Sequence, residues 1–143
     1  MSFAYFDTSA VVKRYVLEPG SLQVRGLLRR HDFLSSAITP LEILSALGRR
    51  RRSGDLSEKS FTAAVRRVDN DRTRWELIEL TAVVLNRAEG IIPRWPMRAL
   101  DALHIASALV FQAAAGLRIR FVTGDHRQRD AAEQMKLEVM WMG

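Results

Sequence analysis

Four carboxylates far apart in the chain each stand at the start of a segment whose pattern predicts a helix. They are Asp7, Glu42, Asp101 and Asp125. Three of them closely follow an apolar run that predicts a buried strand. In a parallel α/β fold, the turns from strand to helix all open on one edge of the sheet, where such proteins bind their ligands. We therefore expect these scattered acids to form one site.

Carboxylates gathered in one site need a cation, because like charges raise one another's pKa values and oppose ionisation at neutral pH. The chain has no cysteine and no obvious histidine cluster. Its ligands would all be oxygen atoms, which suit a hard ion such as Mg²⁺ or Mn²⁺. Such an ion activates water and stabilises the charge on a phosphoryl group under attack. An acidic, metal-binding pocket in a basic protein is the charge pattern expected of a nuclease.

Each acid also has a structural interpretation. Asp7 and Asp125 are placed to cap helices by accepting backbone N–H groups, and the helix dipole favours Asp101 in a first turn. Glu42 stands three residues after Thr39, which is the spacing of a capping box. Capping explains each acid singly, but it does not require four elements to bring their carboxylates to one edge of a sheet.

The elements that must position these acids follow from hydrophobic periodicity. Strands are predicted at Phe3 to Phe6, Phe33 to Ala37, Leu77 to Leu80, Ile119 to Thr123 and Leu137 to Trp141. Helices are predicted at Ala10 to Tyr15, Ser21 to Arg30, Pro40 to Arg52, Glu58 to Arg74, Val83 to Glu89, Ala99 to Ala115 and His126 to Met135. The strands are mostly apolar on both faces, which is typical of parallel sheets covered on both sides. We predict a three-layer α/β/α sandwich around a parallel sheet of four or five strands.

The composition fits a basic, single-domain protein. With 143 residues, of which 48% are hydrophobic, the chain can build one core, and we expect one domain over residues 1–143. Lysine and arginine number 22 against 16 acids, and the net charge of +6 favours a polyanionic partner such as nucleic acid. A solvated, arginine-rich surface would have the same composition.

No segment predicts export or membrane insertion. The N-terminal MSFAYFD lacks a basic region followed by a long apolar stretch. The longest apolar run, around ALHIASALVFQAAAG, is shorter than the roughly 18 residues of a membrane helix. We expect a cytoplasmic protein that does not associate with membranes.

Four segments, in this order, resemble the PIN-domain family and, within it, the VapC-type toxins of type II toxin-antitoxin pairs. They are FAYFDTSAVVKRYVLEPGS, TPLEILSALGRR, RALDALHIASAL and RFVTGDHRQRDAAEQMKLEV. The most specific piece is Leu100 to Ala106, where Asp101 opens a helix as Asp-Ala-Leu-His, and the next is the DTSA turn at Asp7. The resemblance spans essentially the whole chain.

The resemblance implies a Mg²⁺-dependent endoribonuclease, with Mn²⁺ as a substitute metal. Asp7 and Asp101 match the family's principal metal ligands, Glu42 its third acid and Asp125 its fourth. It also implies an RNA substrate, a homodimer, and a cognate antitoxin whose C-terminal segment occupies the active-site groove.

The resemblance also places residues beside these acids. Ser9 and Thr123 match hydroxyl positions that orient carboxylates or substrate. Lys13 and Arg14, one to two turns after Asp7, are placed to meet an RNA phosphate. Arg49 to Arg52 either follow RNA phosphates or form a solvated helix end.

We assign no catalytic role to two further side chains, His104 and Gln128. His104 comes three residues after Asp101. We expect its side chain to be hydrogen-bonded and partly buried, and to lie outside the catalytic set. Gln128 takes a position that relatives more often fill with an aliphatic residue, and we expect it to loosen its helix and the placement of Asp125.

Two other functional classes share parts of this pattern. A non-catalytic nucleic-acid or protein-binding module on a degenerate PIN fold is the main alternative, although it has no need of four acids. A receiver-like or phosphoryl-transfer domain also gathers acids at strand ends, but it needs a lysine on a later strand. No lysine occurs among residues 60 to 135.

Overall fold

The structure, a computed structural model, describes residues 2–143. One sheet of five parallel strands has the order β3-β2-β1-β4-β5. The strands are β1 (Phe3–Phe6), β2 (Asp32–Ser36), β3 (Glu76–Ile78), β4 (Arg120–Thr123) and β5 (Glu138–Trp141). Each overlaps its predicted run, and the predicted parallel sheet is confirmed.

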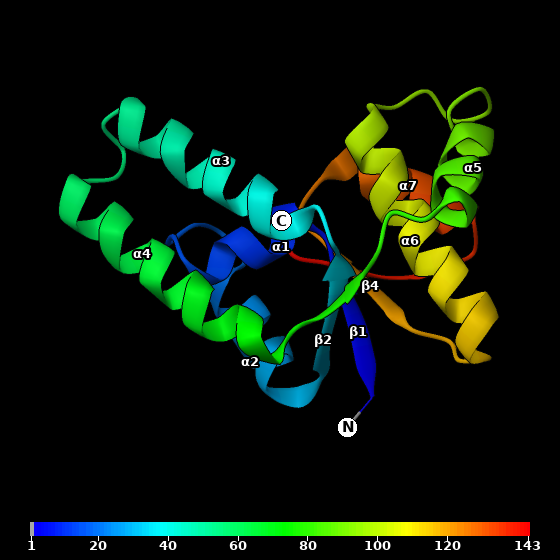
Figure 1. The fold of residues 1–143 in the computed structure, drawn as a ribbon, viewed down its shortest axis with the longest axis horizontal. Helices are drawn as coiled ribbons and strands as arrows, with labels where there is room; N and C mark the ends of the chain where they lie inside the picture. Colours follow the sequence, from blue (N-terminus) through cyan, green and yellow to red (C-terminus); the bar gives the residue numbers. More distant parts are fainter. Residues whose placement is uncertain (1) are drawn as a thin grey trace.

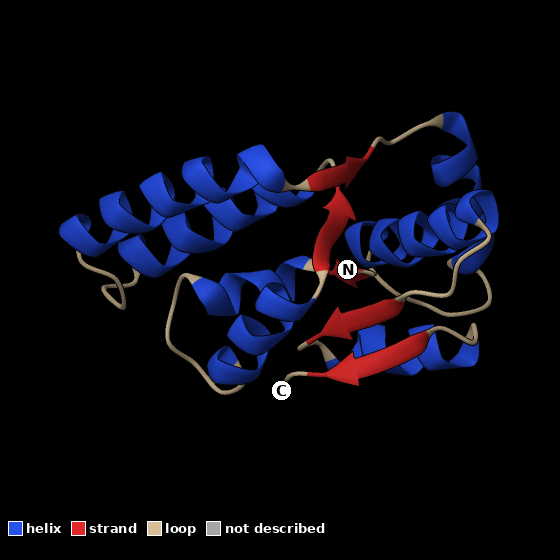
Figure 2. Cartoon of the chain, turned by 90° about the horizontal axis from the view of Figure 1, so that it is seen from below, coloured by secondary structure: helices blue, strands red, loops and turns tan. Residues whose placement is uncertain are grey.

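Helices cover both faces of the sheet (Figures 1 and 2). On one side lie α1 (Thr8–Val11), η1 (Val12–Arg14), α2 (Ser21–Arg30), α3 (Thr39–Arg52), α4 (Glu58–Asp71) and η2 (Arg72–Arg74). On the other side lie α5 (Ala82–Ile91), α6 (Ala99–Ala115) and α7 (His126–Gln134). Figure 1 shows α3 and α4 side by side as a hairpin that extends beyond the sheet. The three-layer α/β/α architecture predicted from the sequence is confirmed.

The central strands supply both hydrophobic cores, because successive side chains of a strand point to opposite faces. Phe6 of β1 and Val122 of β4 pack in the core beneath α1 to α4. Tyr5 and Phe121 pack in the core beneath α5 to α7, with their rings stacked at a centroid distance of 5.3 Å. All four side chains are completely buried, and burying each one stabilises the fold by roughly 1.5–3 kcal/mol.

The order of the strands creates a crevice at their carboxyl ends. The chain moves outward from β1 through β2 to β3, then returns to place β4 and β5 on the opposite side of β1. Open parallel sheets bind ligands at the point where the strand order reverses, which here lies between β1 and β4. The backbone N–H of Asp7 donates to the carbonyl oxygen of Val122 at 3.1 Å, so Asp7 stands directly at this point.

Across residues 2–143, none of the helices combines the length and the apolar character needed to traverse a membrane.

Candidate active site

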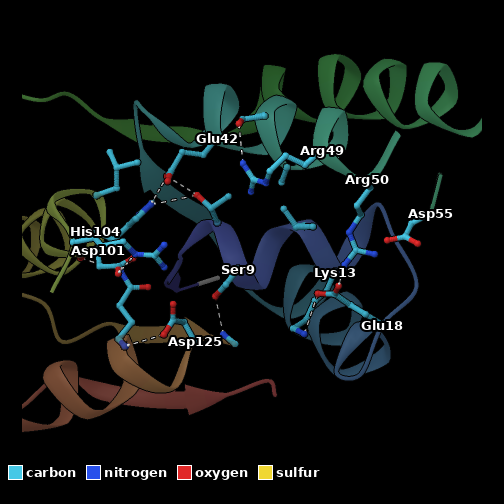
Figure 3. A pocket seen from close by; sticks show the side chains of 18 of the residues that line it. Ser9, Lys13, Glu18, Glu42, Arg49, Arg50, Asp55, Asp101, His104 and Asp125 are labelled. Carbon is cyan, nitrogen blue, oxygen red and sulfur yellow. Dashed lines mark hydrogen bonds and ion pairs between the residues drawn. The ribbon is translucent and has the colours of Figure 1, made fainter. Parts of the chain in front are cut away.

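A pocket of about 920 Å³ opens at the reversal point of the sheet. Helices α1, α3 and α6 and the turn from β4 to α7 contribute to its lining. Three of the predicted acids, Glu42, Asp101 and Asp125, line the pocket, and Figure 3 shows them at one end of it. Asp7 is not exposed to the pocket, since only 1% of its surface is accessible.

Asp7 is held by hydrogen bonds to both carboxylate oxygens. Its Oδ1 accepts from Ser9 Oγ at 2.6 Å and from the backbone N–H of Ala10 at 2.9 Å, and its Oδ2 accepts from Thr123 Oγ1 at 2.5 Å. The predicted cap of α1 is therefore present. Burial raises the pKa of Asp7, and the nearby imidazole of His104 and these hydrogen bonds oppose that rise only in part.

Glu42 does not form the capping box that its spacing predicted, and that prediction is wrong. Helix α3 begins at Thr39 itself, one residue earlier than a Thr39 cap requires, and the Thr39 hydroxyl instead bonds Ser35 Oγ at 2.7 Å. The Glu42 carboxylate turns toward the pocket, where its Oε1 accepts from Thr8 Oγ1 at 2.7 Å. Burial acts to raise the pKa of Glu42, but hydrogen bonds from His104 and Thr8 outweigh it and hold that pKa below its usual value.

His104 lies deeper and closer to the site than the sequence predicted. It is 2% exposed, and its Nε2 lies 2.6 Å from Glu42 Oε1 while its Nδ1 lies 2.7 Å from the Tyr5 hydroxyl. An ionised carboxylate only accepts hydrogen bonds, so Nε2 must donate to Glu42. When the ring is neutral, Nδ1 then accepts from Tyr5. Thr8 belongs to the DTSA turn that the sequence singles out. Tyr5 lies in the apolar FAYF run, which predicted only a buried strand and gave no sign that Tyr5 belongs to this network.

Asp101 carries the most unusual group of the pocket. It lies in the first turn of α6, and its buried Oδ2 has no hydrogen-bond partner among the described residues. The nearest cation, Arg98 Nε, is 3.6 Å away. Burial raises the pKa of Asp101, and the negative charge of Asp125 raises it further. A buried polar atom without a partner is uncommon and calls for an explanation such as an ion.

Asp125 caps α7, as predicted from the sequence. Its Oδ1 accepts from the backbone N–H of Arg127 at 2.8 Å and of Gln128 at 3.4 Å. The expectation that Gln128 loosens this helix is wrong. Gln128 is buried, and its Nε2 donates to the carbonyl oxygen of Asp101 at 3.0 Å, which ties α7 to α6 and places Asp125 beside Asp101.

The donor set fits an open metal site rather than a closed one. Among residues 2–143, no three acidic or histidine side chains lie close enough together to enclose a metal ion. Mg²⁺ commonly binds one or two carboxylates and completes its shell with water and substrate phosphate. Asp101 Oδ2 accepts no hydrogen bond from the described residues and lies 3.6 Å from Arg98 Nε, and Glu42 and Asp125 each anchor one carboxylate oxygen to protein donors. These all-oxygen donors suit Mg²⁺ or Mn²⁺.

Of the two cations expected near an RNA phosphate, the structure brings only one to the pocket. Lys13 lines the pocket, but it is buried and its Nζ donates to Glu18 Oε1 at 3.1 Å and to the Pro19 carbonyl at 2.6 Å. Arg14 points away, and its Nε donates to Asp71 Oδ2 at 2.7 Å. Arg14 therefore holds η1 to α4. Lys13 and Arg14 differ because consecutive residues of this turn project in different directions.

Comparison with known proteins agrees with this geometry. The sequence pattern of the PIN domain matches residues 4–134. The chain belongs to the PIN-domain family. It is 35% identical over 141 residues to Ribonuclease VapC46 of Mycobacterium tuberculosis, covering 98% of both chains. It is 36% identical over 110 residues to Ribonuclease VapC45 of the same species, covering 76% of both.

Solved structures show that this PIN domain shares its fold with VapBC2 and FitAcB. VapBC2 from Rickettsia felis, bound to a DNA fragment from its promoter, aligns with a TM-score of 0.68 and 13% identity over 99% of both chains. FitAcB from Neisseria gonorrhoeae aligns with a TM-score of 0.67 and 18% identity over 96% of both. The resemblance to VapC-type PIN domains seen in the sequence is confirmed.

Proposed function

We propose that this PIN domain is the ribonuclease toxin of a toxin-antitoxin system and hydrolyses RNA phosphodiester bonds in a Mg²⁺-dependent reaction, with Mn²⁺ as a substitute. The observation that carries the proposal is the buried Oδ2 of Asp101, which accepts no hydrogen bond from the described residues and faces Arg98 only at 3.6 Å, in a pocket that Glu42 and Asp125 also line. The similarity to proteins named Ribonuclease VapC supports RNA as the substrate.

The surrounding residues have separate roles in this proposal. Asp101 would ligate the divalent ion, with Glu42 and Asp125 reaching it directly or through water, and the bound ion would activate water and stabilise the charge on the phosphoryl group. Thr8 and His104 fix Glu42 Oε1, so Oε2 is left for the ligand. Mutating residues that orient ligating groups in this way typically lowers metal affinity by about 10- to 100-fold.

Asp7 acts mainly through its neighbours. Because Ser9 and Thr123 donate to its two oxygens, the buried carboxylate holds the ends of β1 and β4 in register. Thr123 Oγ1 also accepts from the backbone N–H of Asp125 at 3.0 Å, which links Asp7 to Asp125. Oδ1 accepts two hydrogen bonds and Oδ2 only one, so one lone pair on Oδ2 remains for a ligand or a water.

The assembly that we propose follows the relatives. Solved neighbours that contain VapB together with VapC support a cognate antitoxin as partner, and we further propose a cytoplasmic homodimer in which residues 1–143 form one nuclease domain. Co-purification with the product of an adjoining small gene would test the antitoxin, and sedimentation would test the dimer.

The nuclease proposal is tested by mapping RNA ends after brief induction of this protein or of its Asp101→Asn variant. New 5′ ends that appear only with the unchanged protein would support it. Absence of new ends, together with no Mg²⁺ binding by calorimetry, would leave the non-catalytic binding module as the function of this fold.

A further inference from the structure

The C-terminal end of α3 carries four consecutive arginines, Arg49 to Arg52, which point in different directions because successive residues turn by about 100° around a helix. Arg50 forms an ion pair with Glu18. Arg51 contacts Glu58 Oε1 at 3.3 Å and lies over the ring of Phe61 at 3.9 Å. These two guanidinium groups are therefore occupied by other parts of the protein.

Arg49 differs from both of these neighbours. It is exposed, lines the pocket, and donates only to the Ser45 hydroxyl, at 3.0 Å, among the described residues. The other pocket cations face carboxylates: Lys13 and Arg50 share Glu18, and Arg98 stands 3.6 Å from Asp101. Within the described chain, Arg49 is thus the pocket cation without a carboxylate partner.

Arg49 stands at a defined distance from the acids. It follows Glu42 by seven residues on α3, which is two turns or about 10 Å along the axis and returns to nearly the same face. Figure 3 shows Glu42, Asp101 and Asp125 at one end of the pocket and Arg49, Arg50 and Glu18 toward the other. Glu18 and Asp55 also line this second end, where Glu18 pairs with Lys13 and Arg50, so a polyanion that extends from the acids through the pocket would meet Arg49 as the cation available to it.

We propose that the wall formed by Arg49 and Ser45 binds a backbone phosphate of a single-stranded RNA, adjacent to the phosphodiester held at the acids. This inference rests on the proposed function and adds the course of the RNA strand along α3. A free guanidinium offers the planar pair of donors that matches phosphate oxygens. A contact of this kind positions the strand without reading its sequence.

The experiment measures binding of a short, fluorescent, single-stranded RNA of mixed sequence by anisotropy at several salt concentrations. The whole chain carries Asp101→Asn so that the RNA stays intact. Arg49→Gln is compared with Arg52→Gln, which removes the same charge from the same helix at an exposed position outside the pocket. We expect Arg49→Gln to weaken binding roughly tenfold and to reduce the salt slope by about 0.7. Arg52→Gln should change both far less.

Three outcomes would count against the inference. Equal losses in Arg49→Gln and Arg52→Gln would show a general effect of charge, and no loss in either would show that the RNA does not follow α3. A parent protein that binds no RNA would overturn the proposed function together with this inference. Arg49→Lys should keep most of the salt slope, because the charge remains, and circular dichroism checks that each variant is folded.

Discussion

His104 fixes the direction in which Glu42 points. The imidazole lies between Tyr5 on one side and Glu42 on the other, with separations of 2.7 and 2.6 Å. Its ring has no freedom to turn, because Tyr5 is completely buried in the sheet. The carboxylate is therefore presented in one orientation before any ligand arrives, which lowers the ordering cost of binding.

Two substitutions separate this positioning role from simple packing. His104→Ala should weaken Mg²⁺ binding by calorimetry about 10- to 100-fold, since it removes a residue that orients a ligand. His104→Gln should recover much of that affinity, because its amide supplies one donor and one acceptor as neutral imidazole does. Equal Mg²⁺ affinity in the alanine variant and the unchanged protein would contradict the role.

Because the pKa of Asp101 is raised, we expect the free energy of unfolding to depend on pH. The pKa of Asp101 in the folded chain lies above the ordinary value of 3.8, first through burial and then through Asp125. The folded state thus binds this proton more tightly than the unfolded state, so the contribution of Asp101 favours folding at low pH. It is lost as pH rises from the ordinary value through the raised one.

In metal-free buffer, the free energy of unfolding of the unchanged protein, relative to Asp101→Asn, should therefore fall as pH rises from about 4. Urea titrations at a series of pH values measure this difference. Taking the difference removes the opposite effects of Glu42 and Asp71, whose pKa values are lowered. A difference that stays constant across this range would refute the raised pKa of Asp101.

The site depends on how α6 and α7 are held together. Gln128 of α7 makes the hydrogen bond to the Asp101 carbonyl, while Asp125 caps the N-terminus of the same helix. A polar residue in this buried position is stable because it has a partner. Its presence fixes the separation between Asp101 and Asp125.

Gln128→Ala should destabilise the protein by about 1–3 kcal/mol, because it removes the amide partner of a backbone carbonyl at the junction of α6 and α7. Gln134→Ala, in the same helix but exposed, is the matched control and should cost less than about 0.5 kcal/mol. Urea unfolding measures both. Indistinguishable stabilities of the two variants would show that this hydrogen bond does not tie the helices.

The whole chain combines a net charge of +6 with a pocket in which acids lie close together. Burial raises the pKa of Asp101 and the charge of Asp125 raises it further, so ionising both acids without a bound cation is unfavourable. A bound divalent ion would relieve that repulsion. We therefore expect binding of a divalent ion to stabilise the folded protein.

Mg²⁺ should raise the melting temperature of the unchanged protein. At a concentration about 100 times Kd, binding to the folded state contributes about 2.7 kcal/mol, which corresponds to several degrees for a chain of this size. Asp101→Asn should show a much smaller shift. Differential scanning calorimetry with Mg²⁺, and with Na⁺ at equal ionic strength, makes the comparison, and equal shifts in both proteins would contradict a role of Asp101 in binding.

The sequence by itself determined the elements and their layers. The apolar runs and helix patterns are local properties, so the strands, the bounds of α6 and the caps at Asp7 and Asp125 could be predicted from neighbouring residues. Buried strands between helices then required a parallel sheet, which placed three acids at one edge.

Only the tertiary structure decided which side chains meet. Glu42 and His104 are 62 residues apart, and their contact depends on how α3 and α6 pack, which no local pattern contains. Similarly, Lys13 and Arg14 are neighbours on a short turn, but their side chains point in different directions. Lys13 lines the pocket and Arg14 binds Asp71. Among the four arginines of α3, Arg50 pairs with the distant Glu18 and Arg51 with Glu58 of the neighbouring α4, whereas Arg49 lines the pocket without a carboxylate partner among the described residues.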